Sequence, residues 1–176
     1  MPSDYRLPAV ELDFATGGEQ FIDPLTGFGS RAKLVADLAD AVTPTSRPST
    51  LAVFELGGLR EYVELYGRLE GDDLVARIAG RLPEAIRLPS SFYRPRGDEL
   101  AALVQGPGAI AEPRVAVAVA ALTSRFDEFK LELAFGAVEL PDGASDPVEA
   151  LILADGSLFL QSLARAARER RRTFRG

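Results

Sequence analysis

The sequence contains neither cysteine nor histidine among its 176 residues. This double absence excludes disulfide bonds, zinc sites built from cysteine and histidine, thiol nucleophiles and histidine-based catalytic triads. A metal ion bound by this protein must therefore be held by oxygen ligands, which favours Mg²⁺, Mn²⁺ or Ca²⁺. A general base must be a carboxylate, a lysine, a tyrosine or a water molecule.

Long apolar runs and an excess of basic residues are also missing. No stretch approaches 18 uninterrupted apolar residues, and the first residues lack a basic start followed by an apolar run. We therefore expect neither a membrane span nor a signal peptide, and we expect a cytoplasmic protein. The net charge of −6 argues against a protein that binds nucleic acid.

The arginines are nevertheless concentrated at the C-terminus, where a single acid, Glu169, accompanies them. Cations at the end of a helix interact favourably with the helix dipole, and a charge run is most often a solvated face. We interpret this tail as a solvated helix end, with a nucleic-acid or lipid site as the alternative. The arginines of the tail are Arg165, Arg168, Arg170, Arg171, Arg172 and Arg175.

The length and the hydrophobic share of 47% fit one domain with a substantial core. Residues 1–20 show no clean periodicity, and we interpret them as an N-terminal arm or linker before a domain over residues 21–176. Helical spacing of apolar residues predicts four helices. The first has Ser30 as its N-cap and ends at residue 42, and the second covers residues 59–66. The third begins at Gly71 or Asp72 and ends at residue 86, and the fourth begins at residue 146 and continues into the tail. Apolar runs and alternation predict strands over residues 51–56, 91–93, 100–104 and 131–140.

One segment leaves two alternatives open. Residues 115–122 alternate valine and alanine, which permits a strand, whereas their alanine content favours a helix. Residues 106–113 are interpreted as a loop. Strands interleaved with helices, including a hairpin around residues 95–98, predict a mixed α/β or α+β sheet with helices packed on it.

Five short motifs occur in the order and at the spacing of a known family. They are Asp-Pro-Leu-Thr-Gly-Phe-Gly-Ser-Arg at residues 23–31, a strand with its helix over 51–72, a hairpin signature at 96–100, Phe-Gly-Ala-Val at 135–138, and Ala-Asp at 154–155 followed by Leu158 and Phe159. The sequence therefore resembles the GGDEF family of diguanylate cyclase domains over residues 21–172. The signature itself is changed to Arg-Gly-Asp-Glu-Leu (RGDEL).

The resemblance implies a nucleotidyl-cyclase-like fold, an α+β architecture with a mixed or antiparallel central sheet of about five strands flanked by helices. It also implies a chemistry in which two GTP-loaded domains face each other and each 3′-hydroxyl attacks the other's α-phosphate, giving cyclic di-GMP. Acidic residues hold Mg²⁺ or Mn²⁺, which neutralises phosphate charge and lowers the pKa of the attacking hydroxyl. GTP, cyclic di-GMP, a second copy and a partner protein are therefore the expected partners.

Four acids take roles from this resemblance. Glu55 and Asp98 correspond to the metal ligands, and Asp98 and Glu99 are the acids of the signature, which we assign as catalytic. Asp72 corresponds to the residue that grips the edge of guanine. The alternatives are solvated carboxylates at strand ends for Glu55, Asp98 and Glu99, and an N-cap of the next helix for Asp72.

Basic and small residues complete the expected site. Arg60, Arg96 and Gly97 correspond to positions beside the nucleotide, and Arg87 is the remnant of an inhibitory site whose aspartate is replaced by Ser90. Arg96 replaces the first signature glycine, so its side chain would lie where phosphates approach, and arginine disfavours positive φ. We predict that Arg96 pairs with a nearby acid rather than with a phosphate.

Other positions depart further from the family pattern. Val63 replaces the asparagine that reads the base, Gly57 replaces the second acid of the first strand, and Ser162 and Ala166 replace two basic residues of the last helix. These losses favour a degenerate, non-catalytic or weakly active regulatory module that binds a guanine nucleotide or a protein. An active diguanylate cyclase and an interaction scaffold without nucleotide are the alternatives.

Overall fold

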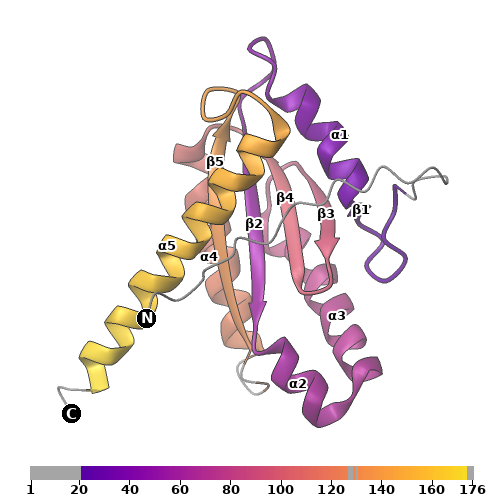
Figure 1. Ribbon diagram of the computed structural model, residues 1–176, viewed down its shortest axis with the longest axis vertical. Coiled ribbons are helices and arrows are strands. Elements are labelled where there is room, and N and C mark those ends of the chain that lie inside the picture. The colour runs from indigo at the N-terminus through magenta and orange to yellow at the C-terminus, as the bar shows by residue number, and fades with distance from the viewer. Residues whose placement is uncertain (1–20, 127–128, 130, 174–176) are drawn as a thin grey trace, which may run out of the picture.

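The computed structural model of the protein describes residues 21–126, 129 and 131–173. The N-terminal arm predicted for residues 1–20 lies outside the described residues. The described chain forms one layer of sheet covered by helices on both faces (Figure 1).

The sheet is mixed and has five strands in the order β1-β3-β4-β2-β5. The central strand β2 pairs antiparallel with β4 on one side and with β5 on the other, and β3 pairs antiparallel with β4. The short edge strand β1 runs parallel to β3. The predicted fold class is thereby confirmed. The strands are β1 (Gly29–Ser30), β2 (Ser49–Gly57), β3 (Ser90–Arg96), β4 (Glu99–Gln105) and β5 (Glu132–Leu140).

Two hydrophobic cores lie on opposite faces of the sheet. Side chains alternate along a strand, so Phe54 of β2 faces the core beneath α3 and α4, while Val53 faces the core beneath α1 and α5. Both side chains are buried. The helices are α1 (Arg31–Ala41), α2 (Leu59–Tyr66), α3 (Arg68–Ile86), α4 (Gly108–Arg125) and α5 (Pro147–Thr173).

The start of α1 agrees with the prediction, because the Ser30 side chain accepts a hydrogen bond from the backbone N–H of Lys33.

The predicted start of α3 is wrong. That helix begins at Arg68, with Gly67 as its N-cap, so Asp72 lies inside the helix and does not cap it. Gly67 has a φ of 95° and lets α3 follow α2 with no intervening loop.

Residues 115–122 form a helix, as their alanine content favours. The loop expected over residues 106–113 is wrong for most of its length, because α4 begins at Gly108 and contains Pro113. Buried Ala111 and Val115, one turn apart, anchor this part of the helix in the core despite the backbone donor that proline lacks.

One helix, α5, is long and apolar enough over Pro147–Ala164 to cross a membrane by length and composition alone, with a mean hydropathy of 1.2. Only 11% of that window is buried. The buried share includes Ala150 and Ala154, which pack in the core against the sheet.

Helix α5 contacts the sheet most closely at Gly136 of β5. A Cβ atom at this position would lie 2.1 Å from the carbonyl oxygen of Ala154 and 2.2 Å from the backbone nitrogen of Leu158. Gly136 therefore sets the distance between α5 and the strand beneath it. Gly156, also in α5, has no atom within 4 Å of the corresponding position.

We expect Gly136→Ala to lower the free energy of unfolding by about 1–3 kcal/mol, because an added methyl group in a closely packed contact forces the backbone apart. The matched variant Gly156→Ala should raise it by up to about 1 kcal/mol, because alanine favours an exposed helix interior over glycine. Urea unfolding followed by circular dichroism measures both changes. Equal effects of the two substitutions would contradict the close contact at Gly136.

Candidate functional site

The signature hairpin is attached to the end of the central strand. Its turn, Gly97-Asp98, joins β3 to β4, and the backbone N–H of Leu56 donates a hydrogen bond of 3.2 Å to the carbonyl oxygen of Asp98. The register of β2 and β4 places Glu55 directly opposite Glu99. Predicted site residues that are far apart in the sequence therefore meet at one end of the sheet.

Glu55 and Glu99 lie on the same face of the sheet. Both follow the alternation that sends Val53 and Ala101 toward the core beneath α1 and α5. Like charges directly opposite each other on neighbouring strands repel. A cation near this pair is therefore stabilising, whether it is a metal ion or a basic side chain.

Arg96 supplies a cation at this position. Its Nε atom lies 3.5 Å from Oε2 of Glu99, so the ion pair predicted for Arg96 is present. The expected conflict with positive φ is absent, because Arg96 lies in the extended strand β3 and Arg87 is the non-glycine residue with positive φ in the described chain. Arginine is thus compatible with the backbone at this signature position.

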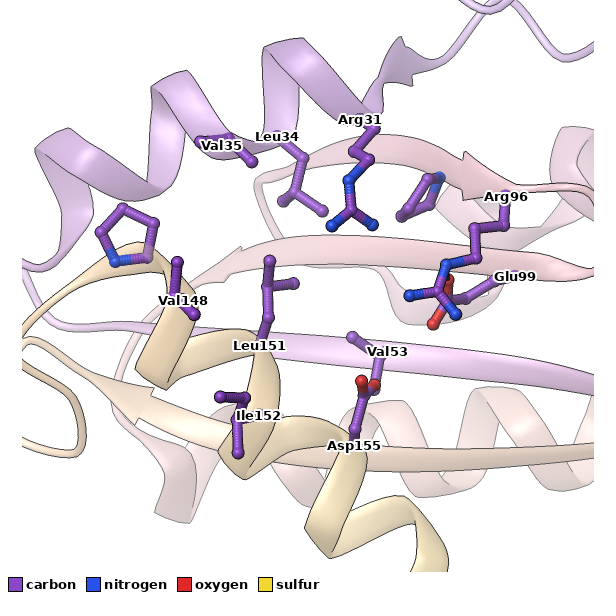
Figure 2. Close-up of a pocket in the computed structure, with 12 residues that line it drawn as sticks. Arg31, Leu34, Val35, Val53, Arg96, Glu99, Val148, Leu151, Ile152 and Asp155 are labelled. Carbon is purple, nitrogen blue, oxygen red and sulfur yellow. Dashed lines mark ion pairs between the residues drawn. The ribbon is translucent and has the colours of Figure 1, made fainter. Parts of the chain in front are cut away.

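A pocket lies between α1, α5 and the hairpin, with the Arg96–Glu99 pair at one end (Figure 2). Figure 2 shows Arg31 of α1 and Asp155 of α5 reaching the same end from the two helices. The rest of the lining is mainly apolar, including Val53 of the central strand. The charged end therefore contains two guanidinium groups and two carboxylates in a largely apolar setting.

The electrostatics of this end follow from its burial. Burial raises the pKa of Glu99, while the Arg96 guanidinium opposes the shift and the Asp155 and Asp98 carboxylates add to it. Burial likewise raises the pKa of Asp155, against the attraction of Arg96 and Arg31. The two guanidinium groups thus compensate only part of the cost of desolvating the acids.

The expected metal ligands lie at the same end of the sheet but do not complete a site. Glu55 and Asp98 are both exposed, and the described part of the chain contains no group of three or more acidic residues that could hold a metal ion. Mg²⁺ is commonly bound by one or two carboxylates together with substrate phosphates. The donor set therefore fits a metal ion that arrives with a nucleotide, and does not fit one that the protein coordinates alone.

The position expected to recognise the guanine base is occupied by an apolar side chain that packs inside the protein. Val63 is partly buried, and its Cγ2 atom lies 2.4 Å from where a Cβ of Gly71 would be, so it packs on the glycine of the next helix. Asp72, adjacent to that glycine, has Arg68 as a distant partner at 3.9 Å. Arg60 is exposed and pairs with Glu64 at 3.3 Å.

Ser162, expected from the resemblance to replace a basic residue, does not line the pocket that contains Arg96 and Glu99. It lines a separate hollow with Ala134, the residue that pairs with Glu55 across β2 and β5. The side chain of Ala166, the second replaced position, lies outside the described residues.

Arg87 does not join the site. It ends α3 in a left-handed conformation with φ of 55°, and its Nε donates to the carbonyl oxygen of Glu84. Strand β3 then runs from Ser90 to Arg96, which separates Arg87 from the hairpin turn by about 20 Å of extended chain. Arg87, expected from the resemblance to be an inhibitory-site remnant, therefore lies at the opposite end of β3 from the hairpin turn.

Arg31 and Asp155 carry no site role in the sequence prediction, although both lie inside matched motifs or next to them. A usable signal is present for Asp155, which interrupts an otherwise apolar helix between Ala154 and Gly156. The signal for Arg31 is its place as the last residue of the matched entry motif over residues 23–31.

Comparisons with known proteins agree with this fold. The family described as "Diguanylate cyclase, GGDEF domain" matches residues 20–170. A sensory box/GGDEF family protein from Caulobacter crescentus CB15 is 25% identical, with a TM-score of 0.62 over 82% of this chain and 99% of that one. The GGDEF domain of DgcB from Caulobacter crescentus, solved with cyclic di-GMP, is 16% identical, with a TM-score of 0.70 over 85% and 94%.

The FimX GGDEF domain from Pseudomonas aeruginosa is 20% identical, with a TM-score of 0.64 over 79% of this chain and 91% of that one. No curated protein matches the sequence significantly. The family match spans most of the chain, including the hairpin, the central strand and most of α5. The chain belongs to the GGDEF family of diguanylate cyclase domains.

Proposed function

We propose that this protein is a degenerate GGDEF domain, a cytoplasmic regulatory module of cyclic di-GMP signalling that binds a guanine nucleotide or a protein partner and lacks efficient catalysis. The observation that carries the proposal is the ion pair of Arg96 with Glu99. The guanidinium stands beside the acid pair of the central strands, where a nucleotide-bound metal ion would be needed for phosphoryl transfer.

Three further features support low activity. Val63 cannot form a hydrogen bond with a base. A binding site that loses a polar side chain of this kind distinguishes less well between bases. Gly57 contributes no second carboxylate beside Glu55, and Ser162 contributes no charge toward a triphosphate. The replacements at Gly57 and Ser162 remove interactions that would stabilise charge in the transition state.

Solved relatives support the choice of ligand and partner class. The DgcB GGDEF domain was solved in complex with cyclic di-GMP, and SiaD from Pseudomonas aeruginosa was solved with its activator SiaC. Binding without turnover needs only part of the catalytic constellation, and this chain retains Asp72, Gly97 and Asp98. Glu55 and Asp98 would hold a Mg²⁺ or Mn²⁺ ion that accompanies a nucleotide only if the Arg96–Glu99 pair opens.

An active diguanylate cyclase is the second candidate, and one observation favours it. Glu55 and Glu99 face each other across β2 and β4, and Asp98 is exposed in the turn beside them. A bound triphosphate with its metal ion would then compete with Arg96 for these acids. This version requires that the Arg96–Glu99 pair opens when GTP binds.

Product analysis after incubation with GTP and Mg²⁺ or Mn²⁺ separates the two candidates. We expect wild-type protein to release no more cyclic di-GMP than Asp98→Ala, and Arg96→Gly to release more, because the hairpin acids are then free for a metal ion. Cyclic di-GMP from the wild type that Asp98→Ala abolishes, in protein shown to be folded, would establish the second candidate.

Nucleotide binding tests the base-reading position separately from catalysis. We expect Val63→Asn to tighten GTP binding by about 5- to 10-fold, because one regained hydrogen bond contributes about 1 kcal/mol. The matched variant Val117→Asn, on the exposed surface of α4, should leave the affinity unchanged. Thermal shift and calorimetry provide the measurement, and no response of any variant to GTP, cyclic di-GMP or Mg²⁺ would favour a scaffold without nucleotide.

The pH dependence of stability tests the buried acid. Because burial raises the pKa of Glu99, its protonated form stabilises the fold below the ordinary value of 4.5, and this contribution is lost as pH rises through the higher folded pKa. Glu99→Gln stays neutral. We therefore expect the stability of the variant relative to wild type to increase as the pH rises above the ordinary value of 4.5 in urea unfolding. A constant difference would contradict the burial of this carboxylate.

A further inference from the structure

The pocket between α1, α5 and the hairpin has an apolar end opposite its charged end (Figure 2). Buried Leu34 and Val53 form its inner wall. Val35, Val148 and Ile152 also line the pocket and remain exposed to solvent. The cavity has a volume of about 90 Å³, the space of about three water molecules at roughly 30 Å³ each. The apolar end therefore fits a short aliphatic group and excludes a long acyl chain.

Arg31 and Asp155 reach the charged end of this pocket from two different helices, α1 and α5 (Figure 2). Arg96 pairs there with Glu99. The side chains of Arg31 and Asp155 form neither an ion pair nor a hydrogen bond with another residue of the described chain. Burial raises the pKa of Asp155, as expected for a carboxylate without a close partner. The pocket therefore presents one cation and one anion that are both available to a ligand.

The balance of charges at this end discriminates between ligands. Two guanidinium groups and two carboxylates leave no net charge when all four are ionised. A ligand with only a carboxylate would also meet the two acids as like charges, and a ligand with only an amine would meet the two guanidinium groups. A ligand that carries both charges at one end finds an opposite charge for each. The charge pattern therefore favours a zwitterion.

Helix α1 determines the direction in which such a ligand binds. Arg31 is the first residue of this helix, and the first turn contains no acidic residue. The partial positive charge at the N-terminus of a helix adds to the charge of the guanidinium. The negative group of the ligand is therefore expected beside Arg31, and its positive group beside Asp155.

We propose that this pocket binds a free aliphatic α-amino acid. Its carboxylate pairs with Arg31, its ammonium pairs with Asp155, and its side chain enters the apolar end beside Val53. The two charges of an α-amino acid are attached to one carbon atom, so they find both partners at one end of the pocket while the side chain points to the other.

This site is separate from the position expected to recognise the guanine base. Val63 packs against the core beneath α3 and α4, whereas Leu34 and Val53 of the pocket belong to the core on the other face of the sheet. Amino-acid binding here goes beyond the function proposed above and does not depend on it. It can therefore be measured without nucleotide and without metal ions.

Calorimetric titration of the full chain with L-leucine tests the site. We expect saturable binding with a Kd below about 1 mM, and a higher unfolding temperature in the presence of leucine. L-Alanine, whose side chain is a single methyl group, should bind about 60-fold more weakly, since each buried methylene contributes a factor of about four. Absence of leucine binding, or equal affinities for leucine and alanine, would overturn the proposal.

Two analogues of leucine test the need for both charges. 4-Methylpentanoate lacks the ammonium group, and 3-methylbutylamine lacks the carboxylate. Each is expected to bind wild-type protein at least about 10-fold more weakly than leucine, because one charge-assisted contact is lost and like charges are left facing the ligand. An affinity for 4-methylpentanoate equal to that for leucine would indicate a simple anion site and contradict the assignment of Asp155.

Substitutions assign the two charged partners. Arg31→Gln and Asp155→Asn should each lower the affinity for leucine by about 10-fold or more. Arg81→Gln is the matched control, because Arg81 is exposed on α3 at the other face of the sheet and should leave the affinity unchanged.

Asp155→Asn has a second readout that general damage to the fold would not produce. With the repelling carboxylate removed, this variant should bind 4-methylpentanoate about as well as leucine. Wild-type affinity for leucine in both Arg31→Gln and Asp155→Asn, or an unchanged preference for leucine in Asp155→Asn, would overturn the proposal.

Discussion

Two carboxylates facing each other across the central strands are the constraint on which the functional end of this domain depends. The register of β2 and β4 places the backbones of Glu55 and Glu99 directly opposite each other. Like charges at such a position are destabilising, and a cation beside them is stabilising. In this chain a guanidinium from the hairpin itself pairs with Glu99, so the fold is complete before any metal ion or nucleotide arrives.

The sheet register that pairs these two acids also brings the other site residues to the same end of the sheet. The hairpin turn is attached to β2 through Leu56, and α5 delivers Asp155 to the same end because Gly136 lets it approach the sheet. The hairpin, the central strand and α5 thus have the arrangement of the GGDEF fold. In the function proposed above, the groups that would recognise the base and neutralise a triphosphate are the ones replaced, at Val63, Gly57 and Ser162.

Much of the fold follows from the sequence, because strand and helix periods are local properties. The central strand, the hairpin and the capped start of α1 are all readable from apolar spacing and turn residues. Two helix starts are misplaced for physical reasons: Gly67 allows α3 to begin directly after α2, and burial of Ala111 extends α4 past a proline. Arg31 and Asp155 reach the same pocket because α1 and α5 pack beside each other on the sheet. The spacing of residues along the sequence does not predict this contact between distant helices.

The central claim is that Arg96 takes the place of a metal ion beside Glu99. Calorimetric titration of GTP in the presence of Mg²⁺ or of a chelator tests it most directly, with Arg96→Gly as the comparison. The account predicts that Mg²⁺ hardly changes the affinity of wild-type protein and clearly increases that of Arg96→Gly. A large gain in wild-type affinity on adding Mg²⁺ would show that the acids accept a metal ion despite the arginine, and would contradict the account.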